Sequence, residues 1–285
     1  MKNFKITGIL LYIILCVGEF MKKNIRHIIS ILIWIAIWTV LWLLLPKQIH
    51  FAGPLEVAKR LVKDVQSKDF WLAIWTTYSG IVSGFFVALF LGTVFGYIAH
   101  YRERFRILMD PAMDFIRHIP MITFTLLAIV WGASTLLVFE VGLFLAIPVI
   151  YRHTCVALNH YTDPILTEVW KRDISLRKKL DYIYRPATMP EYIVGCHRAI
   201  NMCCKSGILA QFIGGASHSV AKSLSEATDA FDITGIFSLT IVIVIISMLL
   251  EQFVIRLLSL TIVNETKIDV EKLIESINEE EDIDI

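Results

Sequence analysis

Ionisable side chains inside long apolar stretches are the residues of this sequence best placed to do chemistry. Lys205 lies in the middle of one such stretch. Charge is costly inside a bilayer, so an ionisable group at that depth is a functional hypothesis by default. Lys205 could attract an anionic solute. The alternatives are a lysine that snorkels to the interface, or one that pairs with Glu140 or Glu191.

Arg117 and His118 form a second polar position, and they lie just before Pro120 in another apolar stretch. A proline inside such a stretch kinks the helix and frees a backbone carbonyl, so we expect a break there. The two side chains could line a pathway through the membrane or bind lipid headgroups.

The sequence contains no recognisable catalytic or metal-binding constellation. None of its eight histidines has a second ligand at i+4 or an H-E-x-x-H pattern. His153 and His160 share a helical face but lack the third ligand that a metal site needs. The five cysteines lie in or beside apolar stretches and show no spaced pairs for a disulfide or a zinc ion. We therefore predict no metal, no cofactor and no enzymatic activity.

The composition indicates an all-α polytopic membrane protein. Of the 285 residues, 56% are hydrophobic and only 19% are charged, and the charges are clustered between apolar runs. The net charge of +1 gives no reason to expect a nucleic-acid partner. We expect about six transmembrane helices, near residues 27–45, 71–99, 107–131, 135–156, 191–213 and 233–258.

The segments between these expected spans differ in character. Val57, Leu61 and Val65 recur every four residues, which predicts an amphipathic surface helix within 47–69. Residues 214–232 are small and polar and are expected to form a loop. In membrane proteins, Lys and Arg are enriched in the cytoplasmic segments. The positive charges before the first span, at 102–106 and at 171–185 all lie on the cytoplasmic side if the N-terminus is cytoplasmic. Lysines at 47–69, a segment then placed outside, weaken this rule there.

Three parts of the chain are distinguished. Residues 1–26 could be an extra hydrophobic segment or result from a mis-chosen start, because Met21 resembles a natural beginning and no small-residue cleavage site is present. Residues 27–263 form the expected transmembrane domain. Residues 264–285 are an acidic tail, either a solvated end or an interaction tail, and we expect both termini in the cytoplasm.

Small residues recur at four-residue spacing along the second expected span. Residues with this spacing let two helix backbones approach closely in lipid, so they predict tight helix packing without indicating a function. They are Gly80, Gly84, Ala88, Gly92 and Gly96.

A long polar block at 159–189 carries the most specific signal. It could dock onto a soluble partner or simply anchor the topology. Within it stand Glu168-Val-Trp-Lys-Arg-Asp-Ile-Ser175 and Arg185-Pro-Ala-Thr-Met-Pro190. Other short motifs occur elsewhere in the chain: Gly53-Pro54, Arg117-His-Ile-Pro120 with Ile129-Val-Trp-Gly132, Lys205-Ser-Gly207, and Asp232 to Glu251. In their order and spacing these motifs resemble permease subunits of ABC importers of the nitrate/sulfonate/taurine family.

The resemblance implies a type I importer permease in a bacterial inner membrane. Two permease copies, identical or not, would form a pathway for a nitrate-, sulfonate- or taurine-like anion, or for a heterocycle like a thiamine precursor. A cytoplasmic ABC ATPase would bind a coupling helix, an extracytoplasmic solute-binding protein would dock on 47–69 and 214–232, and lipids would surround the spans. The implied ATPase-coupling residues are Glu168, Trp170, Lys171, Arg172, Asp173 and Ser175.

Several positions depart from the family pattern. Asp173 or Ile174 replaces the usual glycine of the loop, Trp170 crowds the alanine position, and Arg185 replaces a leucine. Gln211 stands where a glutamate is usual, and we count it as a pathway candidate with Arg117, His118, Pro120 and Lys205. The chain has no G-x-x-x-x-G-K loop and should not hydrolyse ATP by itself. The alternative function is a secondary transporter, which would predict inverted repeats and paired carboxylates in the membrane.

Overall fold

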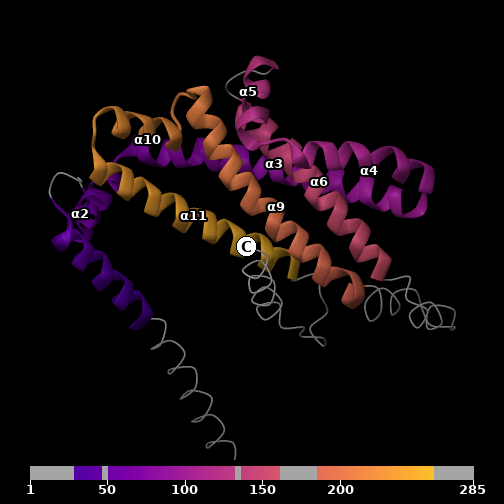
Figure 1. The fold of residues 1–285 in the computed structure, drawn as a ribbon, viewed down its shortest axis with the longest axis horizontal. Coiled ribbons are helices and arrows are strands. Elements are labelled where there is room, and N and C mark those ends of the chain that lie inside the picture. Colours follow the sequence, from indigo (N-terminus) through magenta and orange to yellow (C-terminus); the bar gives the residue numbers. More distant parts are fainter. Residues whose placement is uncertain (1–28, 47–50, 132–135, 161–184, 260–285) are drawn as a thin grey trace, which may run out of the picture.

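The computed structural model describes residues 29–46, 51–131, 136–160 and 185–259 (Figure 1). These ranges contain helices and no strands, which confirms the prediction of an all-α polytopic membrane protein. In chain order the helices are Ile29–Leu44, α2 (Pro54–Val65), α3 (Lys68–Tyr101), α4 (Glu103–His118), α5 (Met121–Trp131), α6 (Leu137–His160), α9 (Arg185–Gly214), α10 (Val220–Asp229) and α11 (Ile233–Ser259). The segments 1–26 and 264–285 lie outside the described residues.

Fewer helices than expected are both long and apolar enough to cross a membrane. Among the described residues these are α3, α6 and α11, and the bent pair α4–α5 would add a fourth. The helix Ile29–Leu44 is apolar but shorter than these helices. Helix α9 has 30 residues, but ionisable side chains along one face lower its hydropathy. By length and composition the described residues therefore contain three spans, or four if the bent pair is one span, where the sequence predicted about six.

The expected break at Pro120 is confirmed. Helix α4 ends at His118 and α5 begins at Met121, and the two helices are bent by 102°. Proline lacks an N–H and disfavours helical geometry in the residue before it. Ile119 accordingly adopts an extended conformation, with φ −71° and ψ 123°.

Helix α6 packs along both α3 and α9 (Figure 1). The small residues of α3 lie at its contact with α6. A Cβ atom on Gly92 would come within 2.8 Å of the Ile150 Cβ, and one on Gly96 within 2.7 Å of the Thr154 Cβ. Without glycine at these positions the two backbones could not lie so close.

Two groups of helix ends define the two ends of the molecule. At the end called here the basic end, α3 and α6 finish and α4 and α9 begin, and His100 Nδ1 lies 3.3 Å from Asn159 Oδ1. At the opposite end lie α2, α10 and the start of α11 (Figure 1). The surface helix expected within 47–69 is confirmed as α2.

The prediction of a loop at 214–232 is wrong in part, because helix α10 occupies its centre. Ser219 begins this helix, and its hydroxyl accepts a hydrogen bond of 3.0 Å from the Lys222 N–H. Val220, Ala221 and Ala227 recur on one face and are buried. This apolar face packs α10 against the rest of the molecule.

Candidate functional site

A cavity of about 720 Å³ opens between α4, α5, α6 and α9 and is lined by several of the charged residues of the expected spans. We call it the cationic cavity. Its ionisable lining consists of four permanent cations, two histidines and one carboxylate: Arg117, Arg152, Arg198, Lys205, His153, His197 and Glu191.

Helical periodicity explains how one helix supplies so much of this lining. Glu191, Arg198 and Lys205 are seven residues apart, so they project from one face of α9. Arg152 and His153 come from α6, and Arg117 comes from the last turn of α4. Met121, the first residue of α5, completes the wall just after the break at Pro120.

The two histidines of the cationic cavity each contact a carboxylate on a neighbouring helix. His153 Nδ1 lies 2.7 Å from Glu191 Oε1, which joins α6 to α9. His197 Nε2 contacts Glu251 Oε1, which joins α9 to α11. The Glu191 and Glu251 carboxylates thus each contact a histidine at or beside the cavity.

The cations differ in their partners. Arg117 Nη2 lies 3.7 Å from Asp114 Oδ1, an exposed carboxylate in the preceding turn of α4. Arg152 and Lys205 form no ion pair with any residue in the part of the chain that the structure describes. The predicted pairing of Lys205 with Glu140 or Glu191 is therefore not observed within these residues.

A smaller cavity of about 220 Å³ adjoins the first toward the basic end. Arg117 and Arg152 line both cavities. At its wall the Tyr151 hydroxyl donates a 2.6 Å hydrogen bond to Asp110 Oδ1, and Arg106 Nε lies 3.2 Å from Asp110 Oδ2. This network fixes α4 against α6 beside the cations.

The predicted pathway residues do not all lie in the cationic cavity. Arg117 and Lys205 line it, whereas His118, Pro120 and Gln211 do not. His118 is exposed, and its Nδ1 lies 2.6 Å from the Asp114 carbonyl oxygen.

Gln211 is instead buried in the packing between helices. It accepts a 2.8 Å hydrogen bond from Thr77 Oγ1, which in turn accepts a 3.1 Å bond from the Val220 N–H. These bonds join α3, α9 and α10. The geometry gives Gln211 a role in holding the helices together.

Two further sets of predicted residues are placed as follows. The predicted ATPase-coupling residues lie outside the described residues, and so does most of the polar block at 159–189 that carries them. They are Glu168, Trp170, Lys171, Arg172, Asp173 and Ser175. The small residues of α3 lie on its face toward α6, where a Cβ on Gly84 would come within 2.8 Å of the Phe139 carbonyl oxygen. They are Gly80, Gly84, Ala88, Gly92 and Gly96.

Sequence reasoning missed the cationic cavity as a unit, because its members come from separate helices. The heptad spacing of Glu191, Arg198 and Lys205 was a signal that could have found the α9 face. No comparable pattern marks Arg152 and His153, which stand between Tyr151 and Thr154 on α6. The cavity suits binding of an anion, and no group of three potential metal ligands occurs within the described ranges.

Comparison with known proteins gives one distant relative. No protein-family model matches the chain. A curated Bacillus subtilis protein named as an aliphatic sulfonates transport permease is 21% identical over 175 residues. The match covers 60% of this chain and 62% of the relative, so the chain spans less than two thirds of that protein's length. The similarity confirms the resemblance to importer permeases that the short motifs predicted.

Proposed function

We propose that the chain is the membrane-spanning permease subunit of an ABC importer that moves a small organic anion. The cationic cavity would form part of the translocation path. The chain acts as a transport subunit without enzymatic activity of its own, and a separate cytoplasmic ATPase supplies the energy.

The observation that carries the proposal is the set of charged side chains that the cavity gathers among largely apolar helices. A guanidinium or ammonium group is costly to hold among apolar helices, and this cost is met where the group faces a watery cavity or a partner of opposite charge. Arg152 and Lys205 have no such partner among the described residues. A bound anion would supply the missing charge.

The anion is favoured over the uncharged or cationic heterocycle that the family resemblance also allowed. Four cations and one histidine-bound carboxylate give the cavity a strongly positive potential. Met121 begins α5 at the cavity wall, and the amino end of a helix adds a partial positive charge. The name of the Bacillus subtilis relative supports a sulfonate as the first solute to test.

Transport would follow from rocking of the helices between two states. The loop at 161–184 would carry the coupling helix, and Glu168 and Asp173 would contact the ATPase. A second permease copy would close the open side of the cavity, and a solute-binding protein would deliver the solute near α2 and α10. A ligand drives such a change only through its different affinity for the two states.

An uptake assay tests the cavity. Cells producing the chain with its transport partners should accumulate labelled ethanesulfonate, and Lys205→Gln should reduce this uptake about tenfold or more, as expected for loss of one close charge. Lys222→Gln is the matched control, since Lys222 lies on α10 and pairs with Glu226. Equal uptake by the Lys205 variant and the wild type would contradict the proposed path.

A second experiment tests the coupling to an ATPase. The tagged chain should co-purify with an ABC ATPase subunit from native membranes. Deletion of residues 165–180 should abolish this association while leaving the chain in the membrane. Retention of the ATPase after the deletion would show that the coupling contact lies elsewhere.

A further inference from the structure

We propose that binding of an anion in the cationic cavity is linked to proton uptake by the two histidines that line it, His153 and His197. The inference rests on the proposed function and concerns the regulation of the same site. It predicts tighter anion binding at lower pH.

His153 is held at the cavity wall by a close helix contact. Its side chain is 12% exposed, and its Nδ1 lies 2.7 Å from Glu191 Oε1. A Cβ on Gly195 would come within 2.3 Å of the His153 Cβ, so α9 can approach this histidine only because residue 195 is glycine. The His153 imidazole therefore faces the cavity and contacts the Glu191 carboxylate.

His197 repeats this arrangement two turns further along α9. Its side chain lines the same cavity and contacts Glu251 of α11, and both groups are about one-fifth exposed. The two pairs thus attach α9 to its neighbours on either side. Each pair places a titratable group next to the permanent cations.

The charged groups around the two histidines come from α4, α6, α9 and α11. Four cations oppose protonation of the histidines: Arg117, Arg152, Arg198 and Lys205. Two carboxylates, Glu191 and Glu251, favour it. Helix α3 contributes no charge at this level, where its Thr93 Oγ1 lies 2.8 Å from the Tyr192 hydroxyl. Among the described residues, Tyr192 and Cys204 of α9 are further titratable neighbours, and Cys204 lies beside Glu251.

These surroundings make protonation depend on the occupancy of the cavity. In the empty cavity the four cations repel an imidazolium while the two carboxylates attract it. A bound anion offsets the field of the cations and so stabilises the protonated histidines. By linkage, protonation of the histidines raises the affinity for the anion by the same factor.

Isothermal titration calorimetry on the full chain in nanodiscs tests the linkage. Ethanesulfonate is the probe, because a sulfonate does not titrate near neutral pH and any proton taken up belongs to the protein. Titrations in two buffers of different ionisation enthalpy report the number of protons bound. We expect net proton uptake, and an affinity about three- to tenfold higher near pH 6 than near pH 8, the range in which histidine titrates.

Histidine variants identify the groups responsible. His153→Gln and His197→Gln keep a hydrogen-bond donor toward the carboxylate and should each reduce the proton uptake. His218→Asn is the matched control, because His218 lies at the opposite end and asparagine tolerates its positive φ of 52°. NMR of labelled histidines in the unaltered protein, with and without ethanesulfonate, gives the same information if a variant fails to fold.

The outcomes separate this inference from the proposed function. Ethanesulfonate binding with no proton uptake and no pH dependence would overturn the linkage and leave the proposed function standing. Proton uptake that persists in the double histidine variant would also overturn it. Absence of binding at every pH would contradict the proposed function, and the linkage with it.

Discussion

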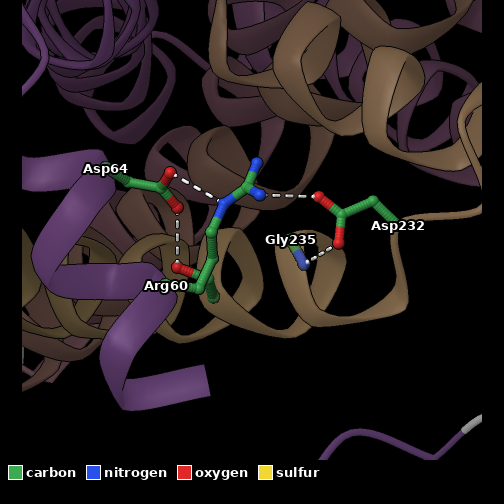
Figure 2. A network of polar contacts seen from close by, with 5 residues as sticks. Arg60, Asp64, Asp232 and Gly235 are labelled. Carbon is green, nitrogen blue, oxygen red and sulfur yellow. Dashed lines mark hydrogen bonds and ion pairs between the residues drawn. The ribbon is translucent and has the colours of Figure 1, made fainter. Parts of the chain in front are cut away.

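Arg60 Nη1 lies 3.0 Å from Asp232 Oδ2, and this ion pair attaches α2 to the start of α11 (Figure 2). The same guanidinium contacts Asp64 one turn further along α2, with Nε 3.0 Å from Oδ1. Asp64 also accepts a 3.0 Å hydrogen bond from Ser238 of α11. Segments more than 160 residues apart in the sequence therefore meet in one polar network at the opposite end.

The network predicts a graded effect of substitutions at Asp232. Asp232→Asn removes the charge but keeps an oxygen that can accept the bond from the Gly235 N–H, and should cost about 0.5–1 kcal/mol. Asp232→Ala also removes this helix cap and should cost about 1 kcal/mol more. Thermal unfolding in detergent measures both. Equal stability of the two variants would show that the cap contributes nothing.

The contact between α3 and α6 predicts that Gly92→Ala destabilises the protein. The added methyl group would lie 2.8 Å from the Ile150 Cβ, and such overpacking costs about 1–3 kcal/mol. Gly142→Ala is the matched control, because its methyl group would meet Cys203 Sγ at an ordinary 3.6 Å. The control should leave the unfolding temperature unchanged or raise it slightly. An unchanged unfolding temperature in Gly92→Ala would contradict the close packing of these helices.

The buried bonds of Thr77 predict that Thr77→Val destabilises the protein. Valine has a similar shape but leaves the Gln211 side-chain oxygen and the Val220 N–H without partners, at about 1–3 kcal/mol each. Thr240→Val is the control, because within the described part of the chain the exposed Thr240 hydroxyl bonds only to the Ile236 carbonyl oxygen of its own helix. Reduced ethanesulfonate uptake by a Thr77→Val protein of unaltered stability would instead place this region on the path.

The proposed orientation predicts which end reacts with a membrane-impermeant thiol reagent. In intact cells Thr228→Cys on α10 should be labelled from outside, whereas Arg104→Cys at the basic end should react only after the membrane is opened. Cys155, Cys196, Cys203 and Cys204 are buried and should give little background. Labelling of the Arg104 variant in intact cells would reverse the orientation and exclude a cytoplasmic ATPase contact near the basic end.

Local patterns in the sequence were enough to predict several elements. The run of apolar residues predicted α3, α6 and α11, the four-residue repeat of Val57, Leu61 and Val65 predicted α2, and Pro120 predicted the break between α4 and α5. Each of these features depends on neighbours along the chain. Helix α10 carried a similar local signal in the spacing of Val220, Leu224 and Ala227, but the small and polar residues between them concealed it.

The cationic cavity depended on information that no single segment contains. Lys205 was recognisable because charge is rare in an apolar stretch, but its relation to Arg152 depends on how α6 packs against α9. The same packing decides that Gln211 is buried against Thr77, although its position in the sequence resembled that of a pathway residue. The partners of His153 and His197 likewise became identifiable only when the helices were assembled.

Arg117 and Arg152 belong to the walls of both cavities. On the proposed path, an anion that moves from the larger space to the smaller one would exchange some of its contacts while keeping those to the two shared guanidinium groups. These groups would lower the barrier between the two spaces for negative charge and raise it for positive charge. The sign of the solute's charge would therefore be selected a second time along the path.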